Sequence, residues 1–162
     1  MRLDTSKIGL LLDTNIWMSY FTREDSTYRD CELLLETAVA NDAPLLVSPT
    51  TLKDVFYLIP RRFHRQDASA GKDNISYEPV AWGCLDFMLD IATPSPLSLI
   101  ECTMANTLRG RFGDFEDNLI LATGESAGAE YIVTYDKPLL KRFPEACITP
   151  KRALELLGSI IA

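Results

Sequence analysis

The sequence predicts a single α/β domain whose parallel sheet is covered by helices on both faces. Short apolar runs alternate along the whole chain with segments whose apolar residues recur at helical spacing. The 162 residues suit one domain, and the 47% hydrophobic content is enough for a sizeable core. No internal repeat divides the chain, so we expect residues 1–162 to form one domain.

The chain is expected to begin with a strand and two helices. The apolar run at residues 7–12 predicts a buried strand, and a helix follows from about residue 14 to residue 21. Residues 28–41 carry apolar side chains on one face and acidic side chains on another, which predicts an amphipathic helix. The turn-forming residues at 41–44 end this helix.

A second strand and a third helix come next. Residues 45–47 predict a short strand, and Ser48 and Pro49 are typical of an N-cap and a first helical position. Four apolar residues then recur at helical spacing: Leu52, Val55, Phe56 and Ile59. Pro60 is expected to end this helix, because proline lacks an amide hydrogen and clashes with the preceding turn.

Residues 61–78 form the one stretch of low hydrophobicity, and we expect them to be a mobile insertion rather than a domain boundary. A helix should follow from Pro79 to about residue 90. Prolines punctuate a third strand or extended segment at residues 93–96. Another helix near residues 99–108 should end in the loop at residues 109–113.

The last third of the chain is expected to supply the remaining strands. The expected elements are a helix at 115–126, a strand at 131–134, a short helix near 138–142, a weak strand near 146–149 and an amphipathic helix at 150–161. Because strand and helix alternate throughout, the sheet should be parallel.

Composition and charge exclude several classes of function. The net charge of −7 argues against broad, nonspecific binding of nucleic acid, although it leaves room for a nuclease with a local basic rim. His64 is the only histidine, so a Ser-His-Asp triad is not expected. No run approaches the roughly 20 apolar residues of a membrane span. The four scattered cysteines are typical of free thiols, so we expect a cytoplasmic protein.

Four aspartates lie where strands should pass into helices or where helices should begin. Asp13 closes the first apolar run, Asp136 follows the strand at 131–134, and Asp54 and Asp117 lie near two helix starts. An aspartate after a buried strand tends to point into the crevice at the strand ends, because burying an unpaired charge is too costly. Converging carboxylates repel one another unless a divalent cation joins them. The pattern therefore predicts a Mg²⁺ or Mn²⁺ site and phosphodiester chemistry.

Each aspartate also has a purely structural interpretation. Asp13 has the position of an N-cap, and Asp136 has that of a residue that starts a turn. Asp114 and Asp117 have the spacing of a capping box. Asp54 lies away from the apolar stripe of its helix, so a solvated position explains it at least as well as a ligand role. The four positions together are harder to explain by capping alone.

Four segments, at residues 10–21, 48–59 and 112–136 and in the closing helix, carry a resemblance to a known family. In this order they are similar to the PIN-domain family, particularly its toxin-like members of the VapC type. The resemblance implies a three-layer α/β/α sandwich with a central parallel sheet of about five strands and acidic residues at one end. The stretch at 61–78 lies outside it.

The resemblance also implies roles for individual residues. The residues that match the family's catalytic and supporting positions are Asp13, Asn15, Asp54, Asp117, Thr134 and Asp136. Asp13, Asp117 and Asp136 would hold one or two Mg²⁺ or Mn²⁺ ions, while Asp54 would help to position a water or the second ion. Asp114 lies one turn before Asp117 and would support metal binding. The family usually has glutamate in place of Asp54, which is shorter by one methylene.

We therefore expect a metal-dependent endoribonuclease that hydrolyses RNA with a metal-bound water, a reaction that needs no histidine. Arginines near two of the acids are expected to hold phosphates on either side of the acidic pocket, although a solvated surface explains them equally well: Arg61, Arg62, Arg65, Arg109 and Arg111. The resemblance further implies the toxin of a toxin–antitoxin pair, with a cognate antitoxin protein as partner, and a homodimer.

Two other functions are open at this point. A phosphatase of the haloacid-dehalogenase type also begins with a strand and an aspartate, but it needs a second acid two residues later, where this chain has Asn15. A PIN-like interaction module for protein or RNA, with weak or no catalysis, fits the acidic surface and the aspartate at position 54.

Overall fold

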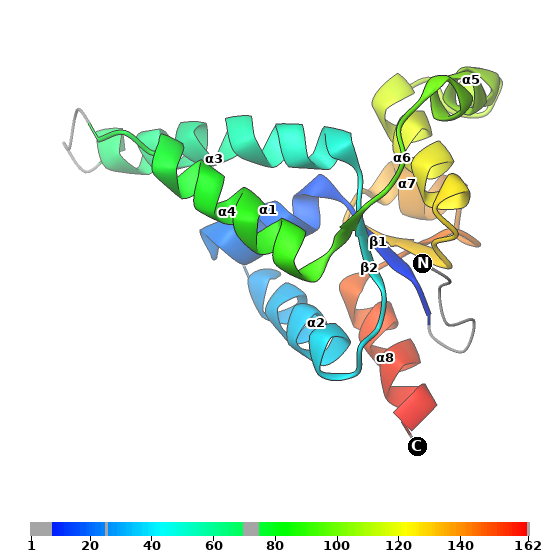
Figure 1. Cartoon of the computed structure of the whole chain (residues 1–162), viewed down its shortest axis with the longest axis horizontal. Coiled ribbons are helices and arrows are strands. Elements are labelled where there is room, and N and C mark those ends of the chain that lie inside the picture. The colour runs from blue at the N-terminus through cyan, green and yellow to red at the C-terminus, as the bar shows by residue number, and fades with distance from the viewer. Residues whose placement is uncertain (1–7, 25, 70–74, 162) are drawn as a thin grey trace.

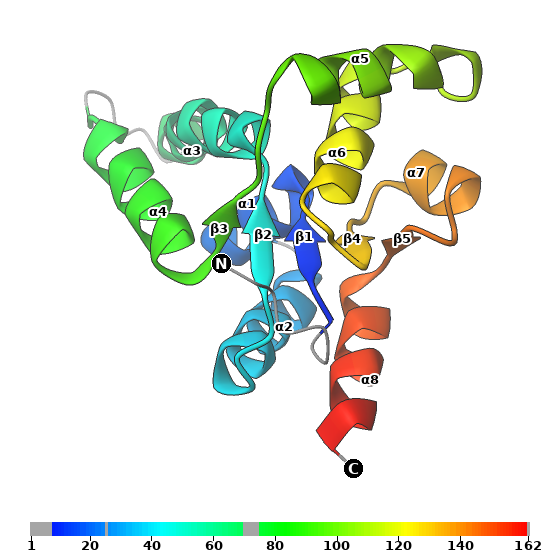
Figure 2. The same cartoon turned by 45° about the vertical axis from the view of Figure 1, so that its right-hand side comes forward.

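A computed structural model describes residues 8–24, 26–69 and 75–161 (Figure 1). Five parallel strands form one sheet in the order β3-β2-β1-β4-β5, which can be followed from one side of Figure 2 to the other. The strands are β1 (Leu10–Leu12), β2 (Leu45–Val47), β3 (Thr93–Pro94), β4 (Tyr131–Val133) and β5 (Cys147–Ile148). The expected all-parallel sheet of about five strands is therefore confirmed.

Alternate side chains of the strands point to opposite faces of the sheet and into two separate apolar clusters. Leu10 and Leu12 face a large cluster formed with five helices, α1 (Thr14–Thr22), α2 (Tyr28–Ala40), α3 (Pro49–Ser69), α4 (Glu78–Ile91) and α8 (Pro150–Ile161). Leu11 faces a smaller cluster formed with α6 (Phe115–Ser126) and α7 (Lys137–Arg142). The sheet thus lies between two helical layers, as expected for a three-layer α/β/α sandwich.

The two remaining helical elements extend the layer on the α6 side. Helix α5 (Leu99–Thr107) packs against α6, and a short 3-10 helix, η1 (Leu108–Gly110), continues from its end. Both Figures 1 and 2 show α5 beyond α6, away from α2 and α8. None of the helices in the described part of the chain combines the length and apolar character that a membrane crossing requires.

The prediction that a helix ends at Pro60 is wrong, because α3 continues through Pro60 to Ser69. An interior proline costs about 3 kcal/mol in an isolated helix. Here tertiary contacts hold the continuation, since Phe63 packs against the core and stacks on Tyr77, with ring centroids 5.3 Å apart. Glu24, in the segment after α1, also accepts hydrogen bonds from Arg62 and Gln66 of α3.

The expected insertion at residues 61–78 therefore consists partly of regular structure. Residues 61–69 form the last turns of α3, residues 75–77 lead into α4, and residues 70–74 lie outside the described residues. Helices α3 and α4 pack side by side and project from the sheet as a pair, which Figures 1 and 2 both show. Arg61, Arg62 and Arg65 are consequently held on a helix rather than in a loop.

At the middle of the sheet, the side on which the chain adds its strands reverses. From β1 the chain adds β2 and then β3 on one side, whereas β4 and β5 are added on the other side. The crevice at the carboxyl ends of β1 and β4 is therefore the topological switch point, where open α/β sheets bind ligands. Asp13 follows β1 directly, and Asp136 comes three residues after the end of β4.

Candidate active site

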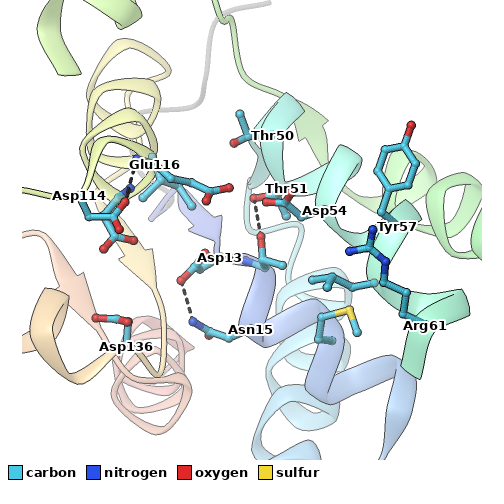
Figure 3. Close-up of a pocket in the computed structure, with 15 residues that line it drawn as sticks. Asp13, Asn15, Thr50, Thr51, Asp54, Tyr57, Arg61, Asp114, Glu116 and Asp136 are labelled. Carbon is cyan, nitrogen blue, oxygen red and sulfur yellow. Dashed lines mark hydrogen bonds between the residues drawn. The ribbon is translucent and has the colours of Figure 1, made fainter. Parts of the chain in front are cut away.

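An acidic pocket of about 680 Å³ lies at this switch point, and α1, α3, α6 and the start of α7 form its walls. It brings together all four aspartates that the sequence singled out, together with two further acids. The carboxylates that line it are Asp13, Asp54, Asp114, Glu116, Asp117 and Asp136. Figure 3 shows Asp114 and Asp136 on one side of the pocket and Asp54 on the other, with Asp13 between them.

Asp13 is the most firmly fixed of these acids. Its backbone amide donates to the Val133 carbonyl at 3.0 Å, so it continues the pairing of β1 with β4. One carboxylate oxygen accepts from the Thr14 amide at 2.6 Å, as an N-cap does. The other accepts from Asn15 Nδ2 and Thr134 Oγ1, both at 2.7 Å. Desolvation raises the pKa of Asp13, and these hydrogen bonds oppose the rise.

Asn15, in the first turn of α1, and Thr134, directly after β4, connect the ends of β1 and β4 at the pocket. Asn15 Nδ2 also donates to Thr134 Oγ1 at 2.9 Å, and Asn15 Oδ1 accepts from the Tyr135 amide at 3.0 Å. Thr134 Oγ1 in turn accepts from the Asp136 amide at 2.9 Å. This network fixes the backbone that carries Asp136. Asn15 is fully used in it as a neutral amide, which speaks against the phosphatase interpretation.

The acids at the starts of α6 and α7 cap those helices with one oxygen each. Asp114 Oδ1 accepts from the amides of Glu116 and Asp117, and Asp136 Oδ1 accepts from the Leu139 amide at 2.8 Å. The second oxygen of each carboxylate forms no hydrogen bond with a described residue. Asp114 thus fulfils its half of the expected capping box, without a reciprocal bond from Asp117, and Asp136, expected to start a turn, is the N-cap of α7. One oxygen of each remains for a ligand.

Asp117 lies in the least favourable position for a negative charge. Desolvation and the neighbouring carboxylates of Asp114, Asp136, Asp13 and Glu116 together raise its pKa to about 6. No hydrogen bond to its carboxylate is found among the described residues, so nothing offsets this repulsion. A group whose charged form is disfavoured by several anions gains most from a nearby cation.

Asp54 lines the pocket from α3, across from α6, which is the orientation that the expected ligand role would need. Its carboxylate is about one fifth exposed and pairs with Lys53 at 2.9 Å. The Glu116 carboxyl reaches it from the other wall, and this contact is the main reason why the pKa of Glu116 is raised. Figure 3 shows Glu116 directed toward Asp54 and Thr51.

Glu116 is the pocket acid that sequence analysis missed. It directly precedes Asp117 on α6, and adjacent helical residues point in different directions. Periodicity therefore gave no reason to place both in one site. The structure brings both into the pocket because α6 begins there, so that its first turn lies beside Asp54 and Asp13. Thr51 was also missed; it is buried and accepts a long 3.4 Å hydrogen bond from Thr14.

The donor chemistry of the pocket suits a hard divalent cation. All six of its acids offer carboxylate oxygens, which Mg²⁺ and Mn²⁺ prefer, and repulsion from neighbouring carboxylates contributes to the raised pKa of Asp117. No three His, Cys, Asp or Glu residues among those described converge closely enough to hold an ion together. An ion would thus be held by one or two carboxylates plus waters, the usual pattern for Mg²⁺.

The five arginines expected beside the acids divide into two groups. Arg61 lines the acidic pocket, and Arg62 and Arg65 line a cavity next to it. Arg109 and Arg111 line neither cavity. Arg111 instead stacks on Phe143, 5.1 Å from the ring centroid. Of these five arginines, only the three on α3 therefore line the acidic pocket or the cavity next to it.

The sheet topology and the acidic pocket at its switch point define an α/β protein with a carboxylate-rich candidate active site. The family model of the PIN domain matches residues 9–138, and the chain belongs to the PIN domain family. The resemblance seen in the sequence is thereby confirmed. No curated protein matches the chain closely enough to be reported as a relative.

Solved structures of two VapBC proteins and of a toxin–antitoxin complex share the fold at low sequence identity. VapBC2 from Rickettsia felis, bound to a DNA fragment from its promoter, is 17% identical; the match covers 88% of this chain and 98% of that chain, with a TM-score of 0.59. A toxin–antitoxin complex from Klebsiella pneumoniae is 20% identical over 87% and 97% of the two chains, with a TM-score of 0.57. VapBC-1 from nontypeable Haemophilus influenzae is 15% identical over 89% and 99%, with a TM-score of 0.58.

Proposed function

We propose that this protein is a metal-dependent endoribonuclease that hydrolyses RNA phosphodiester bonds. The observation that supports it best is the convergence of six carboxylates at the switch point of a PIN-domain sheet, where neighbouring acids help to raise the pKa of Asp117 to about 6. Divalent cations and phosphate groups bind together at such sites, because the cation neutralises both the acids and the substrate.

Asp13, Asp117 and Asp136 are the proposed ligands of one or two Mg²⁺ or Mn²⁺ ions, each ion held directly by one or two of these carboxylates and otherwise by waters. When bound, the ion lowers the pKa of a water and stabilises charge on the phosphodiester oxygens. Asn15 and Thr134 hold Asp13 in place through the hydrogen bonds described above. Such outer partners fix the orientation of a ligand. Asp114 supports the site by capping α6 and so positioning Asp117.

Asp54 and Glu116 face each other across the pocket and would position the attacking water or a second ion. The family usually has glutamate where this chain has Asp54. The longer Glu116 side chain reaches toward Asp54 from α6 and so brings a second carboxyl group close to that position. Lys53 is paired with Asp54, and a metal ion bound at Asp54 would replace Lys53 as its partner. Arg61, on the same wall, is the cation best placed to hold the RNA backbone.

The proposed setting is a cytoplasmic toxin–antitoxin pair. Structures of similar fold include toxin–antitoxin complexes, which supports a cognate antitoxin protein for this chain. An antitoxin with an Arg or Lys side chain would find ready countercharge in the acidic pocket. A homodimer is part of the same proposal. All four cysteines are free thiols in the structure, which suits a reducing compartment.

The second candidate is a PIN-like protein or RNA interaction module with weak or no catalysis. The specific observation in its favour is the 2.9 Å pair between Lys53 and Asp54, which supplies Asp54 with a cation that a metal ion would have to displace. Such a module would bind its partner tightly without turning over RNA.

The test is cleavage of a panel of structured RNAs by antitoxin-free protein with Mn²⁺, Mg²⁺ or EDTA. We expect discrete products with either ion and none with EDTA. Asp13→Asn and Asp117→Asn should each lower cleavage by ~100-fold or more, because they remove proposed ligands. Glu101→Gln is the matched control, since Glu101 lies at the start of α5, outside the pocket. Metal-independent cleavage, or cleavage that survives both substitutions, would refute the proposal.

A further inference from the structure

A second cavity, of about 640 Å³, lies beside the acidic pocket. The two share Asn15, Met18, Leu58 and Arg61, so they are separated only by a common wall formed by α1 and α3. The second cavity extends from this wall toward Tyr135, at the end of β4. A chain that occupies the acidic pocket can therefore continue into the second cavity without leaving the protein surface.

The charges of the two cavities are opposite. Six carboxylates line the acidic pocket, whereas the lining of the second cavity contains no described carboxylate and four cations: Arg61, Arg62, Arg65 and Lys137. Arg62 is paired with Glu24. The other three form no ion pair with a described carboxylate, and all three are exposed. In a chain of net charge −7, such a group of cations is a local site for an anion.

Part of the lining of the second cavity is apolar, which a site for a bare anion would not need. Met18 and Leu58 bring aliphatic side chains to the lining, and Tyr135 also belongs to it. Leu58 is 38% exposed although it is a leucine. Ser19 and Thr27, which also line the cavity, already hydrogen-bond to each other through their hydroxyl groups at 2.7 Å. The cavity thus combines apolar side chains with exposed cations.

We propose that the second cavity binds one nucleotide of a single-stranded RNA next to the phosphodiester held in the acidic pocket. Arg61, Arg65 and Lys137 hold its phosphate, and its base lies against Met18 and Leu58. A nucleotide combines an anionic phosphate with a flat base whose faces pack on apolar side chains. The volume lies in the usual range for small-ligand sites, and a concave site accepts only a base released from a helical stack. This inference rests on the proposed function, because it assumes that the acidic pocket holds an RNA phosphodiester from which the strand continues into the second cavity.

The test measures binding rather than cleavage. A fluorescein-labelled single-stranded RNA of about eight nucleotides is titrated with the full chain carrying Asp117→Asn, which keeps the RNA intact, at several salt concentrations. Adding Arg65→Gln or Lys137→Gln should raise the Kd by about 3- to 10-fold and reduce the salt slope by about 0.7 for the lost phosphate contact. Arg65 and Lys137 line only the second cavity, so they report on it alone.

Two further variants separate the phosphate and base contacts from general electrostatics. Leu58→Ala, an exposed change that should leave the fold intact, should weaken binding by about 3-fold with an unchanged salt slope, because it removes only apolar contact. Lys151→Gln removes the same charge from an exposed lysine outside both cavities and should leave the Kd unchanged. Equal losses for Lys151→Gln and Lys137→Gln would overturn the proposal, because they would indicate nonspecific attraction.

The outcome is independent of the outcome for the nuclease. Cleavage by wild-type protein, with RNA binding unaffected by Arg65→Gln and Lys137→Gln, would refute the nucleotide site alone. Absence of cleavage, with binding that still depends on Arg65 and Leu58, would refute the nuclease and retain the nucleotide site. An oligoglutamate peptide that binds the second cavity more tightly than the RNA would also overturn the proposal, because the ligand would then be an acidic protein segment.

Discussion

Helices α5 and α6 pack against each other and carry an acid at the same position of their first turns, yet the two acids have opposite environments. Glu101 of α5 accepts from the Ser98 amide at 2.7 Å and from the Ser98 hydroxyl at 2.6 Å, which lowers its pKa to about 2. Asp117 of α6 lacks such donors and faces other carboxylates, which raises its pKa to about 6. Each acid is preceded by an N-cap residue three positions earlier, Ser98 or Asp114.

The two acids differ in whether the carboxylate accepts a hydrogen bond from the N-cap residue of its helix. Glu101 completes a reciprocal capping box with Ser98, so its charge stabilises α5. Asp114 caps α6 alone, and Asp117 points into the pocket instead of back to Asp114. One carboxylate is therefore satisfied within the fold, whereas the other has no hydrogen-bond donor among the described residues and is the one proposed to bind a cation. A carboxylate kept in a costly position is a mark of a functional site.

The largest expected effect that separates the two acids is stabilisation by metal. At about a hundredfold excess over its Kd, Mn²⁺ should stabilise the folded wild-type protein by ~2.7 kcal/mol near pH 7.5, because it binds only the folded state. Asp117→Asn should abolish most of this gain in thermal melts, and Glu101→Gln should keep all of it. Equal stabilisation of both variants by Mn²⁺ would mean that the ion binds elsewhere.

The next effect concerns the capping box that Ser98 and Glu101 form at the start of α5. Ser98→Ala should destabilise the fold by about 1 kcal/mol, because it removes the N-cap of α5 and the hydroxyl bonded to Glu101. RNA cleavage per folded molecule should be unchanged, since α5 does not line the acidic pocket. Urea unfolding and cleavage assays on the same preparation measure both quantities. A loss of cleavage without a loss of stability would show that α5 acts on the site.

The sequence predicted the sheet and the positions of Asp13 and Asp136 for one physical reason. Apolar runs that alternate with helical segments favour a parallel sheet, and the ends of its strands meet at one edge. Asp13 and Asp136 each follow a predicted strand, so both were expected at that edge; that their strands are neighbours was known only from the structure. Asp54 and Asp117 were placed by resemblance, and the structure brings both to the same pocket.

The errors of sequence analysis arise from contacts between distant segments. Pro60 has every local property of a helix end, but Phe63 and Tyr77 hold the helix beyond it. Glu116 was missed because its contact with Asp54 crosses the pocket between two helices. Arg109 and Arg111 precede Asp114 closely in sequence but line neither cavity, because the segment that carries them turns away from the pocket toward Phe143.

The smallest expected effect is on stability without metal, and its sign distinguishes the two acids. The pKa of Asp117 is raised in the fold from 3.8 to about 6, so its protonated form is favoured there and its contribution to stability is lost as the pH rises through 6. Asp117→Asn should therefore stabilise the metal-free protein near pH 7, by less than about 1 kcal/mol because solvent screens this partly exposed group. The gain should vanish near pH 4.

The matched change at Glu101 should have the opposite sign. The pKa of Glu101 is lowered in the fold to about 2, so its contribution is present above its ordinary value of 4.5 and is lost only as the pH falls toward 2. Glu101→Gln should thus destabilise the protein near pH 7 in the same EDTA-containing melts. If Asp117→Asn destabilised the metal-free protein at pH 7 as Glu101→Gln does, Asp117 would be a structural capping residue, and the contrast between α5 and α6 would disappear.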